Sequence, residues 1–198
     1  MDIIAEVRRN NESWKRSVFK YVETALLNYA SAHDTFSSQS IRELSQMINV
    51  NYSTHVSNKD LDVIAEELPK ISNIKNRLAE GDITLVKEIS NLALTKGSGK
   101  SRQSFASKLC YMYNRDKFPI YDSFAREILV SWHNNGKPNN EKVKSYGLDY
   151  VKYVQIYLDY QCRNGLQEFT LWQIDKYFWV KGKQNNGTAF MPNSLIKL

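Results

Sequence analysis

Apolar residues recur along most of this chain at intervals of three and four, the spacing of one face of an α-helix. Between Trp14 and Tyr29 they stand at positions 14, 18, 21, 22, 25, 26 and 29, which predicts one amphipathic helix over that span. No segment alternates apolar and polar residues over a length useful for a β-strand, and no internal repeat is present. The pattern predicts an all-α fold.

Cap signals and prolines divide the rest of the chain into further predicted helices. Ser40 and Glu43 have the spacing of a capping box, which predicts a helix through Ile48. The other predicted helices run from Asn58 or Asp60 to near Pro69, from Pro69 to Leu78, from Asp82 to Leu94 after Gly81, and over Gln103–Tyr113, Asp122–Trp132, Tyr150–Cys162 and Leu171–Val180. The predicted loops are Thr95–Arg102, Lys117–Tyr121 and His133–Pro138, and we expect an irregular tail after Gly182.

Positive charge is concentrated in the second half of the chain. The 198 residues carry a formal net charge of +6, with a pI near 9.2. Residues 96–198 hold 16 Lys and Arg against 8 Asp and Glu, whereas residues 1–95 hold 11 against 13. This asymmetry favours a polyanionic partner, most simply double-stranded DNA. The alternative is a modestly basic protein that binds no charged partner.

Cysteine and histidine usage gives no sign of a metal or a cofactor. The two cysteines, Cys110 and Cys162, form no CxxC pair, so a disulfide framework, a zinc knuckle and a four-cysteine cluster lack support. The three histidines stand apart in the sequence. No signal-peptide core or membrane-length apolar run is present. We therefore expect a monomeric cytoplasmic protein, associated with the nucleoid if it is prokaryotic.

The segment Gly97–Ser101 (GSGKS) superficially matches a phosphate-binding loop. That motif requires a Gly six positions before the Lys, where this chain has Leu94, and a preceding strand, where a helix is predicted. We reject a nucleotide site, and a basic turn before a helix remains, suited to a DNA phosphate or simply solvated. The predicted DNA-binding residues are Lys96, Gly97, Gly99, Lys100, Arg102, Gln103 and Lys117.

Asp122 follows Pro119 and Tyr121 at the predicted start of a helix. Asp is a favoured N-cap, because its carboxylate accepts hydrogen bonds from free backbone N–H groups of the first turn. A cap and a catalytic carboxylate are compatible roles, and both readings stay open for Asp122.

The stretch SFASKLCYMYNRDKFPIYDSFAREIL, residues 104–129, resembles the core of the helix-hairpin-helix DNA glycosylase superfamily, including its 8-oxoguanine glycosylase-like members. Ala106 corresponds to a small residue of the family motif, and the 16-residue step to Asp122 fits the family spacing. The resemblance covers some 30 residues firmly. It implies a two-lobed helical fold, with lobes near 36–110 and 1–35 plus 111–198.

The resemblance also implies an activity, the excision of a damaged or modified base from DNA. The base is flipped into a pocket, and a carboxylate, here Asp122, stabilises the positive charge that develops on the sugar. Members that cut the backbone use a Lys nucleophile where this chain has Ser104, which implies a monofunctional enzyme. Lys108 lies one helical turn beyond. The family's hairpin glycines would align near residues 100–102, three positions after the actual glycines.

The predicted base pocket has further candidates, each with a structural alternative. Ser104, Lys108 and Tyr121 adjoin the motif, whereas Gln173, Asp175 and Trp179 come from an aromatic segment, Leu171–Trp179, that suits base stacking or a helix core equally. Two rival functions remain open. One is a non-catalytic DNA-binding module, and the other is a helical protein-interaction domain.

Overall fold

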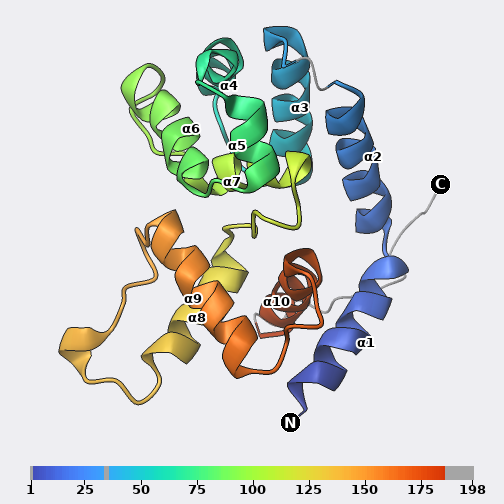
Figure 1. Ribbon diagram of the computed structural model, residues 1–198, viewed down its shortest axis with the longest axis vertical. Coiled ribbons are helices and arrows are strands. Elements are labelled where there is room, and N and C mark those ends of the chain that lie inside the picture. The colour runs from blue at the N-terminus through green and yellow to red at the C-terminus, as the bar shows by residue number, and fades with distance from the viewer. Residues whose placement is uncertain (1, 34–35, 186–198) are drawn as a thin grey trace. The chain divides into compact units, whose positions relative to one another are not determined.

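The computed structural model describes residues 2–33 and 36–185, and within these ranges it contains helices and no strand (Figure 1). The expectation of an all-α fold is confirmed. The α-helices are α1 (Ile3–Lys15), α2 (Val18–Ala32), α3 (Ser38–Asn51), α4 (Asn58–Glu67), α5 (Ile74–Glu80), α6 (Thr84–Thr95), α7 (Gln103–Tyr113), α8 (Ser123–Asn134), α9 (Tyr150–Arg163) and α10 (Leu171–Asn185). Two short 3₁₀ helices are η1 (Leu68–Lys70) and η2 (Asn139–Glu141). No helix in the described ranges is long and apolar enough to span a membrane.

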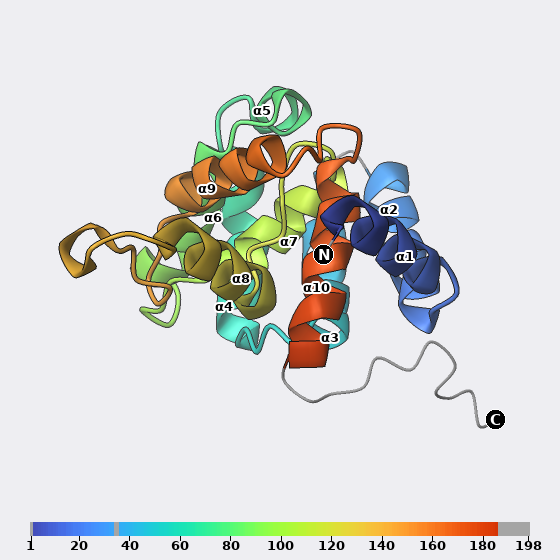
Figure 2. The same ribbon diagram turned by 90° about the horizontal axis from the view of Figure 1, so that it is seen from below.

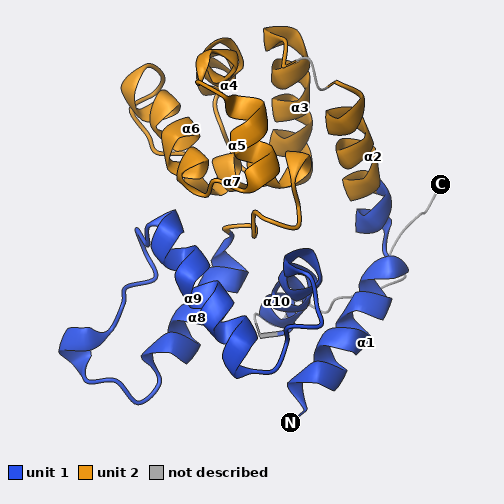
Figure 3. Cartoon of the chain, in the orientation of Figure 1, with its two compact units in different colours: residues 1–21, 122–198 blue, residues 22–121 orange. Residues whose placement is uncertain are grey.

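The chain divides into two compact units (Figure 3). Unit 1 comprises Met1–Tyr21 and Asp122–Leu198, and unit 2 comprises Val22–Tyr121. Two hydrogen bonds join the segments near the borders of unit 2 to α7. The Tyr111 hydroxyl donates to Glu23 at 2.7 Å, and the Tyr121 N–H donates to the Ser107 hydroxyl at 3.0 Å. The lobes expected from the sequence, 36–110 and 1–35 plus 111–198, have their borders at other residues.

Helix α7 is the central element of unit 2. Every residue from Phe105 to Met112 is buried, as is typical of a helix surrounded on all sides by its neighbours. Helices α3, α5 and α6 pack against it, and α4 packs against α3 and α6.

In unit 1, α10 lies between α1 and α8, and α9 packs on α8 (Figure 2). Its core is aromatic. Tyr157 and Tyr160 meet the Phe178 ring edge to face, with centroids 5.5 and 5.1 Å away. The Tyr157 hydroxyl, which must find a partner when buried, donates to the Leu171 carbonyl at 2.7 Å.

The predicted single helix Trp14–Tyr29 is two helices, which is a correction. Helix α1 begins at Ile3, where Asp2 caps it, and ends at Lys15. Both the backbone N–H and the hydroxyl of the buried Ser17 donate to the Trp14 carbonyl, at 2.9 and 2.8 Å. This local arrangement competes with continued helix, and α2 begins only at Val18.

Three predicted helix starts lie a few residues away from the observed ones. Ser37, not Ser40, caps α3, and Ser57 caps α4 in place of Asn58 or Asp60. Pro69 belongs to η1, and α5 starts after Asn73, whose left-handed backbone (φ 53°) separates the two. In each case a neighbouring residue supplies the cap or the turn.

Helix α10 passes through Gly182 and continues to Asn185, although irregular structure was expected after Gly182. The remainder of that predicted tail lies outside the described residues. Gly182 serves a close approach between helices, because a Cβ there would lie 2.4 Å from Cβ of Phe124 on α8.

Candidate functional site

The loop between α6 and α7 is held by hydrogen bonds to one buried carboxylate, that of Asp60 on α4. The Ser98 N–H donates to Oδ1 of Asp60 at 2.7 Å, and the Ser98 hydroxyl donates to Oδ2 at 2.8 Å. Arg102 donates to the same Oδ2 from Nε at 2.9 Å and from Nη2 at 2.7 Å. Asp60 has no exposed surface, and both of its oxygens accept hydrogen bonds from the loop.

The ionised form of Asp60 is the one that this arrangement favours. Burial raises the pKa of its carboxyl group, but the hydrogen bonds from Ser98 and Arg102 outweigh burial and hold the pKa below its usual range. A buried charge of this kind persists only when it is paired and hydrogen-bonded, as it is here.

Two glycines allow the loop to take this path. A Cβ on Gly97 would lie 2.4 Å from Oδ1 of Asp60 and 2.8 Å from the Ala93 carbonyl, so only glycine fits. Gly99 has a left-handed backbone (φ 75°) with open space around it. Ser90 of α6 completes the loop by accepting from the Arg102 N–H at 2.9 Å.

The predicted DNA-binding cations of the loop differ in whether they form ion pairs. The Arg102 side chain is 17% exposed and bound to Asp60, and Lys96 pairs with Glu67 at 2.6 Å. Lys100 is exposed and makes no ion pair with any residue in the described ranges. The loop therefore presents one free cation, Lys100, together with the exposed backbone of Gly99 and Ser101.

Gln103 and Lys117 lie at opposite ends of α7. Gln103 is the first residue of the helix, beside the loop, whereas Lys117 follows its last turn. The Lys117 stem lies against Gly81 at the end of α5. A helix of 11 residues is about 16 Å long, so the structure does not bring Lys117 to the loop.

Ser104 and Lys108 form a close pair on α7. The Lys108 amine donates to the Ser104 hydroxyl at 2.7 Å and lies 5.9 Å from the Tyr52 ring centroid. Lys108 is only 4% exposed. The structure thus joins these two predicted residues, with the amine directed to the hydroxyl of its own helix. Tyr121 is also buried.

Asp122 is the N-cap of α8, as its position in the sequence predicted. Its Oδ1 accepts from the Ala125 N–H at 2.8 Å. Within the described part of the chain, Oδ2 accepts no hydrogen bond. Asp122 belongs to unit 1, whereas Ser104 and Lys108 belong to unit 2.

The three predicted pocket residues of α10 have separate roles. Gln173 forms a capping box with Thr170, whose N–H donates to Oε1 of Gln173 at 2.9 Å. Asp175 is buried. The Trp179 ring packs edge to face on Trp14, at a centroid distance of 5.3 Å.

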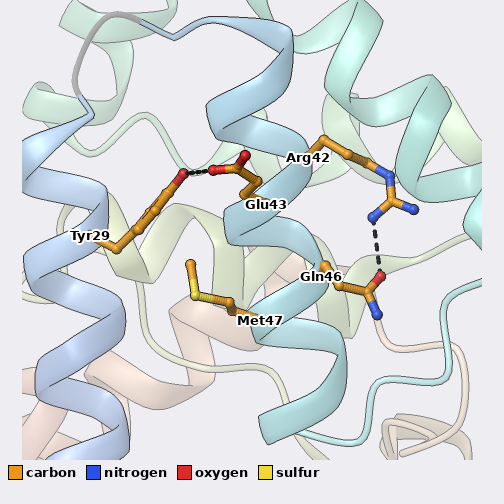
Figure 4. Close-up of a pocket in the computed structure, with 5 residues that line it drawn as sticks. All are labelled: Tyr29, Arg42, Glu43, Gln46 and Met47. Atoms are coloured by element: carbon orange, nitrogen blue, oxygen red, sulfur yellow. Dashed lines mark hydrogen bonds between the residues drawn. The ribbon is translucent and has the colours of Figure 1, made fainter.

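A groove of about 470 Å³ between α2 and α3 is a second candidate site (Figure 4). Tyr29 donates to Glu43 across it, and this hydrogen bond raises the pKa of Tyr29 to about 12. Arg42 is already engaged, by Asp62 at 2.5 Å and by Gln46 at 3.0 Å. The charged side chains that line the groove are thus paired, and Met47 adds an apolar side chain.

A pocket of about 370 Å³ in unit 1 lies among α8, α9 and α10. Its lining consists of Phe124, Glu127, Ile128, Ser131, Trp132, Tyr160 and Gly182. Sequence reasoning missed this pocket, and it considered Asp60 only as a possible helix start. Asp60 carried a usable signal, since it stands four residues before Ile64, on the buried face of α4.

Among the described residues, no group of three or more His, Cys, Asp or Glu could hold a metal.

Comparison with known proteins gives the chain a family. A family model described as HI_0787_N, N-terminal domain, matches residues 5–117, from α1 to the end of α7 and including the α6–α7 loop. An uncharacterized protein of Haemophilus influenzae strain Rd is 31% identical over 151 residues, which cover 76% of this chain and 70% of the relative. No solved structure matches the chain. On these matches, the chain belongs to the HI_0787_N family.

Proposed function

We propose that this protein binds double-stranded DNA and excises a damaged or modified base, with Asp122 as the catalytic carboxylate. The observation that carries the proposal is the hydrogen bonding of the Asp122 carboxylate. One oxygen is held by the first turn of α8, and the other has no hydrogen-bond partner in the described ranges. A helix N-terminus also favours negative charge at that position. Asp122 is therefore a fixed carboxylate with one oxygen available for chemistry.

Cleavage of an N-glycosidic bond needs a group of this kind. As the base departs, positive charge develops on the sugar, and a fixed negative charge stabilises it without reorganising at the moment of reaction. The free Oδ2 of Asp122 is suited to this task and to orienting the water that attacks C1′. The residues around Asp122, 104–129, are those that resemble the helix-hairpin-helix glycosylases.

The α6–α7 loop supplies the grip on the DNA backbone in this proposal. The Lys100 and Ser101 N–H groups make no hydrogen bond within the described chain, and both residues are exposed. Exposed backbone N–H groups beside a lysine suit a phosphate, whatever the base sequence. Asp60 keeps the loop in shape, so binding needs little ordering of it.

The proposed activity stops at base excision. A strand-cutting member needs a lysine at the position of Ser104, and the neighbouring amine of Lys108 is buried and donates to that serine. Ser104 cannot form the Schiff base through which such a cut proceeds.

Single-turnover assays on duplexes that each carry one modified base test this proposal. Asp122→Asn keeps a side chain that caps helices as well as Asp does, but it removes the charge. We expect the excision rate to fall by about 10²-fold or more, with the melting temperature nearly unchanged. Asp2→Asn is the matched control, since Asp2 caps α1 in the same way. Equal rates for wild type and Asp122→Asn would refute the mechanism.

A non-catalytic DNA-binding module is the second candidate. The loop favours this candidate, because Lys96 and Arg102 form ion pairs with Glu67 and Asp60. The loop therefore has fewer unpaired cations for DNA phosphates than a fully basic hairpin would have. This candidate predicts salt-dependent duplex binding and no product from any modified base.

A further inference from the structure

Unit 1 carries a band of aromatic side chains with a lysine at its centre. We define the aromatic band as Phe19 of α2, Phe124 and Trp132 of α8, Tyr160 of α9, and Trp179 and Lys183 of α10. All six residues belong to unit 1, although Phe19 is more than 100 positions before the others in the sequence.

Ring contacts join the members of the band in two groups, which meet at the pocket in unit 1. Phe19 and Trp179 meet with centroids 5.1 Å apart, and the Lys183 amine lies 5.3 Å from the Trp179 centroid and 5.5 Å from that of Phe124. At the far end, the Trp132 and Tyr160 rings meet edge to face at 5.1 Å. Phe124, Trp132 and Tyr160 then line the pocket of about 370 Å³. The band runs from Phe19 to this pocket.

Burial distinguishes the band from an ordinary core. Phe19 is 42% exposed, and Phe124, Trp132 and Lys183 are partly exposed. Lys183 forms no ion pair with any described residue. Two aromatic faces hold its amine in place, and the N–H groups stay available to an anion. Partly exposed rings beside an unpaired cation suit a ligand that is both flat and negatively charged.

Charge points to the same kind of ligand. By sequence, unit 1 holds 15 Lys and Arg against 10 Asp and Glu, and unit 2 holds 12 against 11. The net charge of +6 therefore lies almost entirely in unit 1. The pocket adds hydrogen-bonding groups, the carboxylate of Glu127 and the hydroxyl of Ser131, which can receive the edge of a base rather than a phosphate.

We propose that the aromatic band binds single-stranded DNA. Successive unpaired bases stack on Phe19 and Phe124, one base enters the pocket beside Trp132 and Tyr160, and Lys183 neutralises a phosphate between them. A duplex keeps its bases stacked inside and cannot offer their faces to these rings, and an apolar protein segment would not use the lysine. The inference is independent of base excision, because Asp122 and the α6–α7 loop take no part in it.

Titration of a fluorescent dT20 oligonucleotide at low salt tests the band. Phe19→Leu keeps an apolar side chain of similar bulk but removes the ring, and we expect it to weaken binding about 5- to 100-fold. Lys183→Gln removes the charge at a partly exposed site, and we expect weaker binding and a smaller salt dependence. Tyr21→Leu is the control, since Tyr21 is 71% exposed on α2 but outside the band. It should bind like wild type.

The possible results separate this proposal from base excision. Wild type that fails to bind dT20, or Phe19→Leu and Lys183→Gln that both bind like wild type, would overturn the inference. A clear preference for rU20 over dT20 would assign the band to RNA and would overturn it as well. Excision of a modified base, measured on the same variants, reports on Asp122, so either proposal can fail alone.

Discussion

Arg102 donates two hydrogen bonds to one oxygen of Asp60, from Nε at 2.9 Å and from Nη2 at 2.7 Å. This pairing across 42 positions of sequence changes the role expected for Arg102. Its guanidinium holds the loop to α4, and Lys100 alone among the loop cations faces solvent without an ion pair in the described ranges. The shape of the loop therefore depends on Asp60, a residue with no surface exposed to a ligand.

Replacing Asp60 by Ala should be strongly destabilising. The change leaves the Arg102 guanidinium, only 17% exposed, without its counter-ion, and loss of one partner of a buried pair costs about 3–5 kcal/mol. Asp62→Ala is the matched control, because Asp62 on the same helix is 58% exposed in its pair with Arg42 and should cost less than about 1 kcal/mol. Urea unfolding measures both, and similar losses for the two variants would contradict this role of Asp60.

Replacement of either loop glycine by Ala should be destabilising, for different reasons. Gly97→Ala places a Cβ against Asp60 and the Ala93 backbone and should cost about 1–3 kcal/mol or more, because neither neighbour can move freely. Gly99→Ala meets open space, and only the left-handed backbone opposes it, at about 1–2 kcal/mol. Thermal unfolding compares them. If Gly97→Ala unfolds at the wild-type temperature, the close contact with Asp60 is wrong.

The stability of the protein should fall with acid partly through Asp60. Its folded pKa lies below the ordinary value, so its contribution is fully present above the pKa of the unfolded chain and is lost as pH falls through the folded pKa. The difference in unfolding free energy between wild type and Asp60→Asn should be greatest near about pH 7 and shrink below about pH 4. Chemical unfolding across this range measures it, and a difference that grows toward low pH would reverse the predicted sign.

Local signals in the sequence were enough for much of the fold. The range Gln103–Tyr113 coincides with α7, and Asp122 was placed correctly as the start of α8. Periodicity and caps act over a few residues, and such features are visible in the sequence. The break after Lys15 was not, because it depends on which carbonyl the Ser17 hydroxyl selects.

Long-range contacts decide the rest. Asp60 and Ser98 are 38 positions apart, and no local pattern pairs them. Gly182 suggested the end of a helix, whereas its actual role is to admit Phe124, a neighbour known only once α8 and α10 are packed. The loop between α6 and α7 was therefore visible in the sequence, but the pairing of Arg102 with Asp60 and of Lys96 with Glu67 was not.

Binding of duplex DNA as a function of salt is the most direct test of the central claim, since base excision and the non-catalytic alternative both require it. We expect wild type to bind an unmodified duplex more tightly at about 50 mM than at about 200 mM salt, with a linear slope of log affinity against log salt. Lys100→Gln should reduce that slope by about one unit. Lys75→Gln, an exposed lysine of α5, should leave it unchanged. No appreciable binding at low salt, or a slope that Lys100→Gln does not alter, would contradict the account.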